Sequence, residues 1–324
     1  MAGSRIKTLN SSGEQFMPRI KLFAAFVLIA AVVMTAACGG DDDATMPIET
    51  TKVTLNFSNM PQLDGLYYQA WALVGSYGYS LGKFNFNSSN QMIDTTGALI
   101  TDNEFLIDVG LAYMDGIGIT IEPEDDSLGT PTTYLLGGDV DGTSATLTTE
   151  HEAGMYASFS TLSGKYILAT PTNGTGNDEL SGIWFIDNSS GFASKGLNVP
   201  DLSSTWSYEA WVVIDGTPVS TGTFSSPSDA DDSLLYGSTQ TAPLFPGDDF
   251  LLNAPAGLTF PLDLSGKSVF VTVEINPDPD PDTPSPFKIL EADIATGATD
   301  HLTYTMQVIA SSNIPSGTAT LEAQ

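Results

Sequence analysis

The chain has 324 residues, 41% of them hydrophobic, so it is long enough to bury a core in about two domains. Its 10 Lys and Arg residues stand against 39 Asp and Glu residues, which gives a formal net charge of −29. So negative a surface repels phosphate backbones and anionic lipid headgroups, which excludes nucleic acid as a partner and disfavours electrostatic binding to lipid.

The first element in chain order is an export signal over residues 1–37. Arg19 and Lys21 precede an apolar run from 22 to 34, and small residues follow. A membrane-spanning helix needs about 20 apolar residues, so the shorter run predicts a signal peptide. Met17, just before the basic pair, is a possible true start.

Cys38, the single cysteine of the chain, ends this segment after Ala36 and Ala37. The segment resembles the lipobox of bacterial lipoproteins, although Thr35 stands where leucine is commonest. The resemblance implies that Cys38 carries diacylglycerol and an acyl chain such as palmitate, and that residues 38–50 form a lipid-anchored acidic tether. Several acyl chains together hold a protein stably on a membrane.

Three aspartates at 41–43 follow the cysteine. They resemble the short acidic stretch of surface-exported lipoproteins, which implies the cell-surface side of the outer membrane. A solvated spacer on a protein at the periplasmic face is the alternative, since charge runs are usually solvated.

An internal repeat organises the rest of the chain into two tandem modules, 51–190 and 191–324. A Tyr-x-Ala-Trp motif followed by Ser-x-Gly-x-Phe occurs in both copies, and an apolar-Thr-apolar-Glu motif follows in the same order at 119–122 and 271–274. The repeat signature comprises Tyr68, Trp71, Gly82 and Phe84 in one copy and Tyr208, Trp211, Gly222 and Phe224 in the other. We interpret these positions as structural.

The motifs predict strands. Residues 208–214 are aromatic and β-branched, Asp215-Gly216 is a hairpin turn signal, and 219–224 would be the return strand. Further strands are expected at 165–169, 182–186, 269–275 and 288–294. Apolar residues at helical spacing are not sustained beyond the signal segment, so we predict an all-β fold of two tandem β-sandwich-like modules. The four tryptophans are expected in the core.

The signature resembles the extracytoplasmic C-terminal domain of anti-sigma-K factors. That family has a Tyr-Gln-x-Trp strand, a Pro-Val-Ser-x-Gly-x-Phe return and a Thr-x-Glu-Pro segment. The corresponding residues here are 208–211, where Glu209 replaces the glutamine, 218–224 and 120–123. The resemblance implies a β-sandwich sensor or interaction domain. The sequence shows neither the helical sigma-binding domain nor the membrane-spanning helix of that family, so direct sigma-factor binding is not expected, and only the fold carries over.

Few residues indicate a catalytic or metal-binding role. His151 and His301 each follow an acid and could serve a hydrolase, but surface pairs are the simpler interpretation. Asp278, Asp280 and Asp282 alternate with prolines; they are weak candidates for Ca²⁺, since this backbone is extended and splays its carboxylates. No zinc site and no cofactor is expected.

The sequence therefore favours a non-catalytic exported lipoprotein that acts as a binding, sensing or scaffold module at the cell envelope. Its partner would be an extracytoplasmic protein or glycan, bound through loops such as 85–103, 171–180 and 225–250. One alternative is carbohydrate binding on exposed rings of Tyr77, Tyr79 or Tyr236. The other alternative is an uncharacterised hydrolase.

Overall fold

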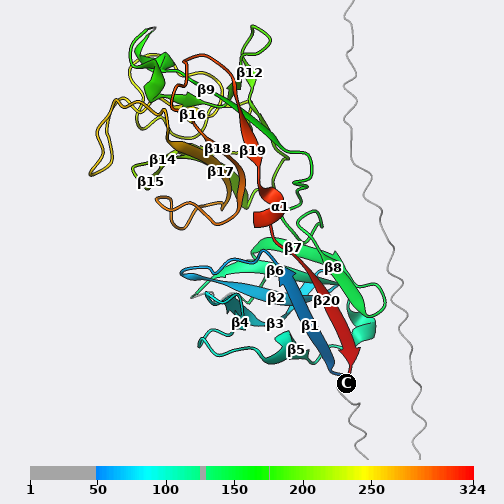
Figure 1. The fold of residues 1–324 in the computed structure, drawn as a ribbon. Helices are drawn as coiled ribbons and strands as arrows, with labels where there is room; N and C mark the ends of the chain where they lie inside the picture. The colour runs from blue at the N-terminus through cyan, green and yellow to red at the C-terminus, as the bar shows by residue number, and fades with distance from the viewer. Residues whose placement is uncertain (1–48, 125–128, 175) are drawn as a thin grey trace, which may run out of the picture. The chain divides into compact units, whose positions relative to one another are not determined.

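The structure, a computed structural model, describes residues 49–124, 129–174 and 176–324, all within the compact unit Pro47–Gln324. In these residues the regular structure is almost entirely β (Figure 1). A single turn of α-helix, α1 (Ala310–Asn313), and four 3₁₀ turns are the exceptions within the described ranges. The predicted all-β fold of sandwich-like modules is confirmed.

The first module is a sandwich of two antiparallel sheets. One has the order β5-β1-β20-β8 and is made of β1 (Thr51–Ser58), β5 (Glu104–Ile107), β8 (Ser144–Leu147) and β20 (Ser316–Ala323). The other has the order β4-β3-β2-β6-β7 and is made of β2 (Leu66–Val74), β3 (Tyr77–Phe86), β4 (Met92–Ile93), β6 (Gly116–Pro123) and β7 (Thr133–Asp139). Phe57 of β1 stacks on Phe84 of β3 with ring centroids 5.6 Å apart, which joins the two sheets through the core.

The second module is built on one nine-stranded sheet with the order β15-β14-β17-β18-β19-β9-β10-β16 and with β13 beside β9. Its strands are β9 (Ser163–Leu168), β10 (Ile183–Trp184), β13 (Leu197–Asn198), β14 (Trp206–Ile214), β15 (Thr217–Phe224), β16 (Gly247–Asp248), β17 (Ser268–Ile275), β18 (Lys288–Asp293) and β19 (Tyr304–Val308). A small ribbon pairs β11 (Ile186–Asp187) with β12 (Ser194–Lys195). The end strands β15 and β16 lie in contact, so the sheet curls towards closure.

The two sequence copies fold alike. The hairpins β2–β3 and β14–β15 each carry a bulge, between Ala70 and Trp71 and between Ala210 and Trp211. Gly82 and Gly222 follow the extra residues of these bulges, Leu81 and Thr221, on the same strands. Their φ values are +145° and +115°, a region open to glycine and strained for other residues. These glycines recur because both hairpins bend at the same place.

Strand pairing divides the chain differently from the repeat. The C-terminal strand β20 lies between β1 and β8 of the first module, with Leu321 opposite Val53, and the blue and red strands run side by side in Figure 1. The strands β9 and β10, which precede residue 190, pair with β19, β13 and β16 of the second module. The second module is thus inserted between β8 and β20 of the first.

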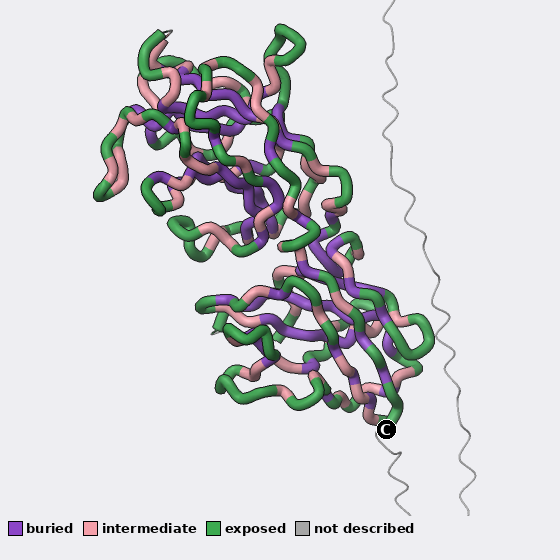
Figure 2. Tube along the Cα trace, in the orientation of Figure 1, coloured by how far each residue is buried: buried purple, intermediate pink, exposed green. Residues whose placement is uncertain are grey.

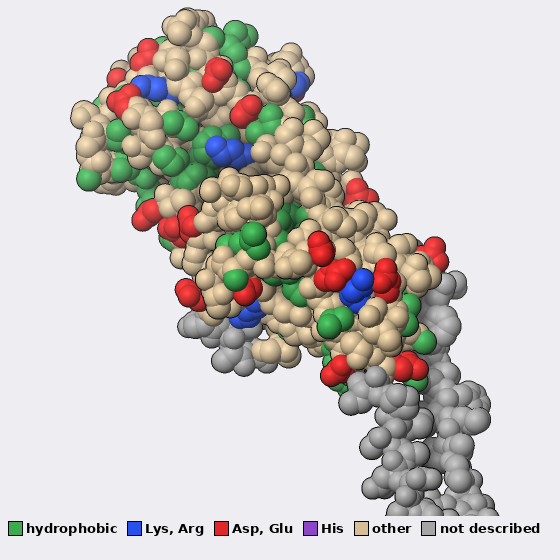
Figure 3. All heavy atoms as spheres, turned by 60° about the horizontal axis from the view of Figure 1, so that its bottom comes forward, with side chains coloured by type: hydrophobic (Ala, Val, Ile, Leu, Met, Phe, Trp, Pro, Cys, Tyr) green, Lys and Arg blue, Asp and Glu red, His purple; other side chains and the backbone are tan. Residues whose placement is uncertain are grey.

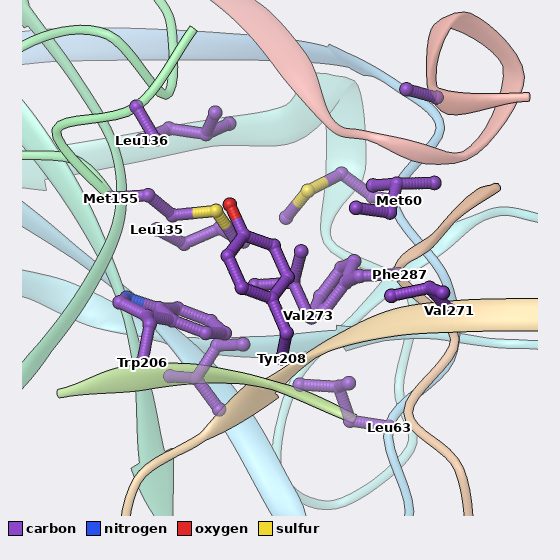
Figure 4. Close-up of a cluster of buried hydrophobic side chains, with 14 of the residues drawn as sticks. Met60, Leu63, Leu135, Leu136, Met155, Trp206, Tyr208, Val271, Val273 and Phe287 are labelled. Carbon is purple, nitrogen blue, oxygen red and sulfur yellow. The ribbon is translucent and has the colours of Figure 1, made fainter. Parts of the chain in front are cut away.

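The core runs along the inner faces of these sheets, as the purple segments of Figure 2 show. Figure 4 shows Tyr208 among Trp206, Met155, Val273 and Phe287 in this core. The Tyr208 hydroxyl donates to the carbonyl of Pro200 at 2.7 Å, as Tyr68 does to Pro61 at 2.9 Å. Buried polar atoms need such partners, so the signature tyrosines also hold the segment before each central strand.

Candidate functional site

The two repeats carry a polar cluster on the outer face of their central strands, away from the sandwich core. Trp71 of β2 donates from Nε1 to Thr120 Oγ1 of β6 at 2.8 Å. Trp211 of β14 makes the equivalent bond to Thr272 Oγ1 of β17 at 3.0 Å. Both indoles are buried, together with Trp184 and Trp206, so the predicted burial of the four tryptophans is confirmed. A buried indole N–H needs an acceptor, which explains the recurring threonine.

Three carboxylates converge beside Trp211. Glu209 lies on β14, Glu274 on the neighbouring β17, and Asp278 on the proline-rich segment that follows β17. One oxygen from each lies within 4.8 Å of the others. Glu209 and Glu274 are each only 2% exposed. These three residues are the acidic cluster.

The hydrogen bonds of the acidic cluster leave two buried oxygens unpaired. The Ser220 hydroxyl donates to Glu209 Oε1, and Glu274 Oε1 accepts from the Thr272 hydroxyl and from the Ser285 amide at 3.0 Å. Glu209 Oε2 and Asp278 Oδ2 are buried and accept no hydrogen bond from the described residues. A buried carboxylate oxygen without a donor is costly, so a proton or a cation is the natural partner.

Burial dominates the electrostatics of the acidic cluster. Desolvation, with a contribution from neighbouring carboxylates, raises the pKa of Glu209 to about 8 and that of Glu274 to about 7, although hydrogen bonds from Ser220 and Thr272 oppose the rise. Desolvation also raises the pKa of Asp278. Ionised carboxylates at this short distance disfavour each other, so the cluster retains protons near neutral pH unless a positive charge enters.

The first module holds a different set at the same positions. The cross-strand partners Gln69 and Lys83 correspond to Glu209 and Thr223 in the second module. Gln69 donates from Nε2 to Ser80 Oγ at 2.8 Å, where Glu209 instead accepts from Ser220. The first module therefore carries an amide and a lysine where the second carries a carboxylate and a hydroxyl.

The structure brings only one of the three predicted metal candidates into the acidic cluster. Asp278 joins it, whereas Asp280 and Asp282 are exposed. Sequence reasoning missed Glu209 and Glu274 as site residues. An acid inside an otherwise apolar strand was the available signal, because such a residue is buried only with a partner or with a raised pKa.

A second buried acid group ties loops of the same module together. Asp249 accepts bonds from the Thr172 amide at 2.8 Å and from Trp184 Nε1 at 2.8 Å, and Asp248 accepts from the amides of Tyr236 and Asp249. Burial raises the pKa of Asp248 to about 7. This group is saturated by donors of the chain, so we assign it to loop structure.

The histidines contact carboxylates and backbone. His151 Nε2 lies 3.1 Å from Asp139 Oδ1, and its Nδ1 accepts from the Ala153 amide at 3.0 Å. His301 Nε2 lies 3.5 Å from Glu179 Oε2. The hydrolase alternative required a hydroxyl beside one of these rings. These contacts hold the histidines at loop positions.

The aromatic candidates separate into two groups. Tyr77 and Tyr79 are 69% and 45% exposed and lie two residues apart on β3, so they point to the same side of the strand. Tyr236 is 9% exposed and packs against Phe250 and Phe260 with centroid distances of 5.4 and 5.2 Å. Only Tyr77 and Tyr79 of the three proposed rings are accessible.

Cys38, the signal segment and most of the acidic tether lie outside the described residues. Among the described helices, none has the length and apolarity to cross a membrane. Comparisons with protein-family models, curated proteins and solved structures gave no match. The resemblance to anti-sigma-K factors therefore stays a prediction.

Proposed function

We propose that this chain is a non-catalytic lipoprotein that binds an extracytoplasmic partner through loops of its second module. It would be anchored in the outer membrane through Cys38 and displayed at the cell surface. The observation that carries this proposal is the segment from Ser225 to Pro246, which links β15 to β16 without a regular strand or helix. Irregular segments of this length in compact modules are usually functional.

This binding segment exposes apolar side chains. Leu234, Leu235 and Leu244 are 39%, 57% and 73% exposed. Exposed leucines gathered on one segment favour contact with a protein, because their burial against a partner removes apolar surface from water. The segment falls within the predicted loop 225–250.

The binding segment is also held against the sheet. Asp232 accepts from the Thr223 amide and hydroxyl, both at 2.8 Å, and Asp231 Oδ2 accepts from the Gly247 amide at 2.9 Å. Asp231 and Asp232 thereby tie one point of the segment to both flanking strands, and a loop restrained in this way loses less conformational entropy when it binds. These bonds therefore support recognition by a largely preformed surface.

The acidic surface agrees with an exposed location. Red acidic side chains outnumber blue basic ones on the face drawn in Figure 3. A strongly negative protein stays soluble and avoids nonspecific contact with anionic envelopes. β1 begins at Thr51, directly after the proposed tether, so the folded part would start close to the anchor.

Proteinase treatment of intact cells tests the anchor and the location. We expect the wild type to be membrane-bound and digested, and Cys38→Ala to be released from the membrane. Digestion only after the outer membrane is opened would place the protein at the periplasmic face. Unchanged membrane association of Cys38→Ala would overturn the anchor.

Loop variants test the binding segment. Two fluorescently labelled full-length proteins are presented to intact cells and to arrayed glycans. One carries only Cys38→Ala, and the other also carries Leu235→Ser and Leu244→Ser. We expect the double loop variant to lose binding and to keep its melting temperature. Leu302→Ser, at a residue 54% exposed elsewhere in the second module, is the matched control and should bind normally. Equal loss in both variants would refute the segment as the binding surface.

A second candidate function is carbohydrate binding on the first module. The paired exposed rings of Tyr77 and Tyr79 favour it, because adjacent aromatic rings on a strand form a platform for the apolar face of a sugar. Tyr77→Ala should then abolish retention in polysaccharide-containing gels, and Tyr113→Ala, at another exposed tyrosine, should not. Equal migration of all three proteins in every polysaccharide would remove this candidate.

A further inference from the structure

The acidic cluster has no ion-pair partner among the described residues. Within the described ranges, no lysine or histidine nitrogen lies within 4.0 Å of Glu209, Glu274 or Asp278. Glu209 is 2% exposed, and its Oε2 accepts no hydrogen bond from the described residues. One of its carboxylate oxygens lies within 4.8 Å of an oxygen of Glu274 and of an oxygen of Asp278. Carboxylates removed from water in this way require a partner.

The first module indicates which kind of partner is missing. There, residue 69 is a neutral glutamine and its cross-strand neighbour is Lys83, whereas the second module has Glu209 opposite Thr223. The two modules keep the same hairpin, bulge and Trp–Thr hydrogen bond. At these two positions one negative charge is added and one positive charge is lost, while Lys288 stands opposite Thr272 where Tyr134 stands opposite Thr120. The Lys288 amino group lies over the Phe270 ring, 3.8 Å from its centroid, and makes no ion pair with the three carboxylates. Gln69 Oε1 is buried without a hydrogen-bond partner as Glu209 Oε2 is, so the added charge distinguishes the second module and points to a cation from solution.

Two pockets border the residues of the acidic cluster. Glu209 and Ser220 line a pocket of about 490 Å³, which Asp282 also borders. Glu274 and Asp278 line another pocket of about 390 Å³. An ion in either pocket would therefore lie next to residues of the acidic cluster.

We propose that Glu209, Glu274 and Asp278 form a binding site for a hard divalent cation, with Ca²⁺ as the physiological ion. The ligands would be three carboxylates from β14, β17 and the segment after β17. The site goes beyond the proposed partner binding and does not depend on the lipid anchor.

The chemistry of the carboxylate donors favours Ca²⁺ over Mg²⁺ and zinc. All donors are oxygens, which suits Ca²⁺ and Mg²⁺ and not zinc, whose structural sites use cysteine and histidine. Ca²⁺ accepts irregular coordination by carboxylates, whereas Mg²⁺ requires a near-ideal octahedron and releases its waters reluctantly. Two carboxylates fixed on neighbouring strands and a third on a loop fit Ca²⁺ better. Affinity on the order of 0.1–1 mM is expected, as in other extracellular modules.

The direct test uses Tb³⁺, a luminescent Ca²⁺ substitute, with the full-length protein after chelation and dialysis at pH 8. Trp211 is joined to Glu274 through Thr272 by consecutive hydrogen bonds, so excited tryptophan should sensitise bound Tb³⁺. We expect Tb³⁺ emission that Ca²⁺ displaces. We also expect a rise of about 3 °C in melting temperature at roughly tenfold Ca²⁺ excess over the Kd.

Two matched variants decide the assignment. Glu209→Gln reproduces the residue of the first module, which is compatible with this scaffold, and should weaken Ca²⁺ and Tb³⁺ binding at least about tenfold. Asp280→Asn removes one charge from an exposed residue of the same segment and should leave binding unchanged. Asp278→Asn should behave like Glu209→Gln.

Three results would overturn the proposal. The first is wild-type protein whose emission and melting temperature do not respond to Ca²⁺ at several mM. The second is equal weakening by Asp280→Asn and Glu209→Gln, which would indicate a diffuse charge effect. The third is stabilisation by Mg²⁺ with no response to Ca²⁺, which would refute the choice of ion.

Discussion

The C-terminal strand should be essential to the first module, and Leu321→Ala measures this directly. Leu321 is fully buried in β20 and lies opposite Val53 of β1, which is equally buried. Truncating a buried leucine removes its transfer free energy and leaves a cavity, at a cost of roughly 2–5 kcal/mol. We therefore expect a loss of about 3 kcal/mol in the free energy of unfolding.

The assay is urea unfolding followed by tryptophan fluorescence, together with thermal melting. A loss of about 3 kcal/mol in a unit of this size should lower the melting temperature by roughly 5 °C. Thr320→Ala is the control, because Thr320 is the neighbouring exposed residue and points to the opposite side of the same strand. Its effect should stay within about 0.5 kcal/mol.

The reasoning fails if the two variants lose equal stability. It also fails if a chain ending at Pro315 melts like the wild type, because this truncation removes the whole of β20 from between β1 and β8. Either result would mean that β20 does not complete the first sandwich in solution.

Three further predictions concern the second module. Trp211→Phe should cost about 2–3 kcal/mol of unfolding free energy by urea titration, because it removes volume and the N–H partner of Thr272. Gly222→Ala should lower the melting temperature and cost about 1–3 kcal/mol, since φ is +115° and the added methyl would meet Asp231 at 3.0 Å. The free energy of unfolding should fall as pH rises from about 4 to 8. Burial raises the pKa of Asp248 from 3.8 to about 7, so the folded state binds this proton more tightly than the unfolded state does. The resulting stabilisation is complete at low pH and is lost as pH rises through about 7. Asp248→Asn should reduce the pH dependence of the urea midpoints without abolishing it, because the pKa values of Glu209 and Glu274 are raised into the same range. An unchanged slope would show that Asp248 does not contribute.

Much of the fold could be predicted because its signals are local. The Asp215-Gly216 turn adopts positive φ at both residues, and the strands on either side occupy 206–214 and 217–224, close to the predicted ranges. Alternation of apolar residues and turn chemistry act over a few residues, so one copy of the repeat also predicts the other.

Partners of strands were harder to predict, because pairing is decided by burial between distant segments. Strand 316–323 carries no signature motif, and its place beside β1 depends on Ala319 and Leu321 reaching a core formed by residues far earlier in the chain. The strands predicted at 165–169 and 182–186 do pair with each other as β9 and β10, yet their outer partners are β19 and β16.

The acidic cluster shows the same limit for the candidate site. Asp278 was considered because it lies in a conspicuous Asp-Pro series, whereas Glu209 and Glu274 each stand alone in an apolar strand. Only the antiparallel register, with Ser207 opposite Glu274 and Glu209 opposite Thr272, brings the two glutamates to neighbouring places on one face. The sequence identifies each glutamate as unusual in an apolar strand. Whether the two glutamates lie close together depends on how the two strands pair.

The return of β20 has a mechanical consequence. Thr51 lies opposite Ala323 and Ser58 opposite Ser316, so the start of β1 and the start of β20 are at opposite ends of the pair. An anchor before Thr51 and a load on the inserted module would pull these two starts apart along the strand direction. All hydrogen bonds between β1 and β20 would then resist together in shear, instead of opening one after another as in a hairpin pulled from its ends. A protein held at its N-terminus and bound through its second module would therefore carry tension across a strand pair that is loaded in shear.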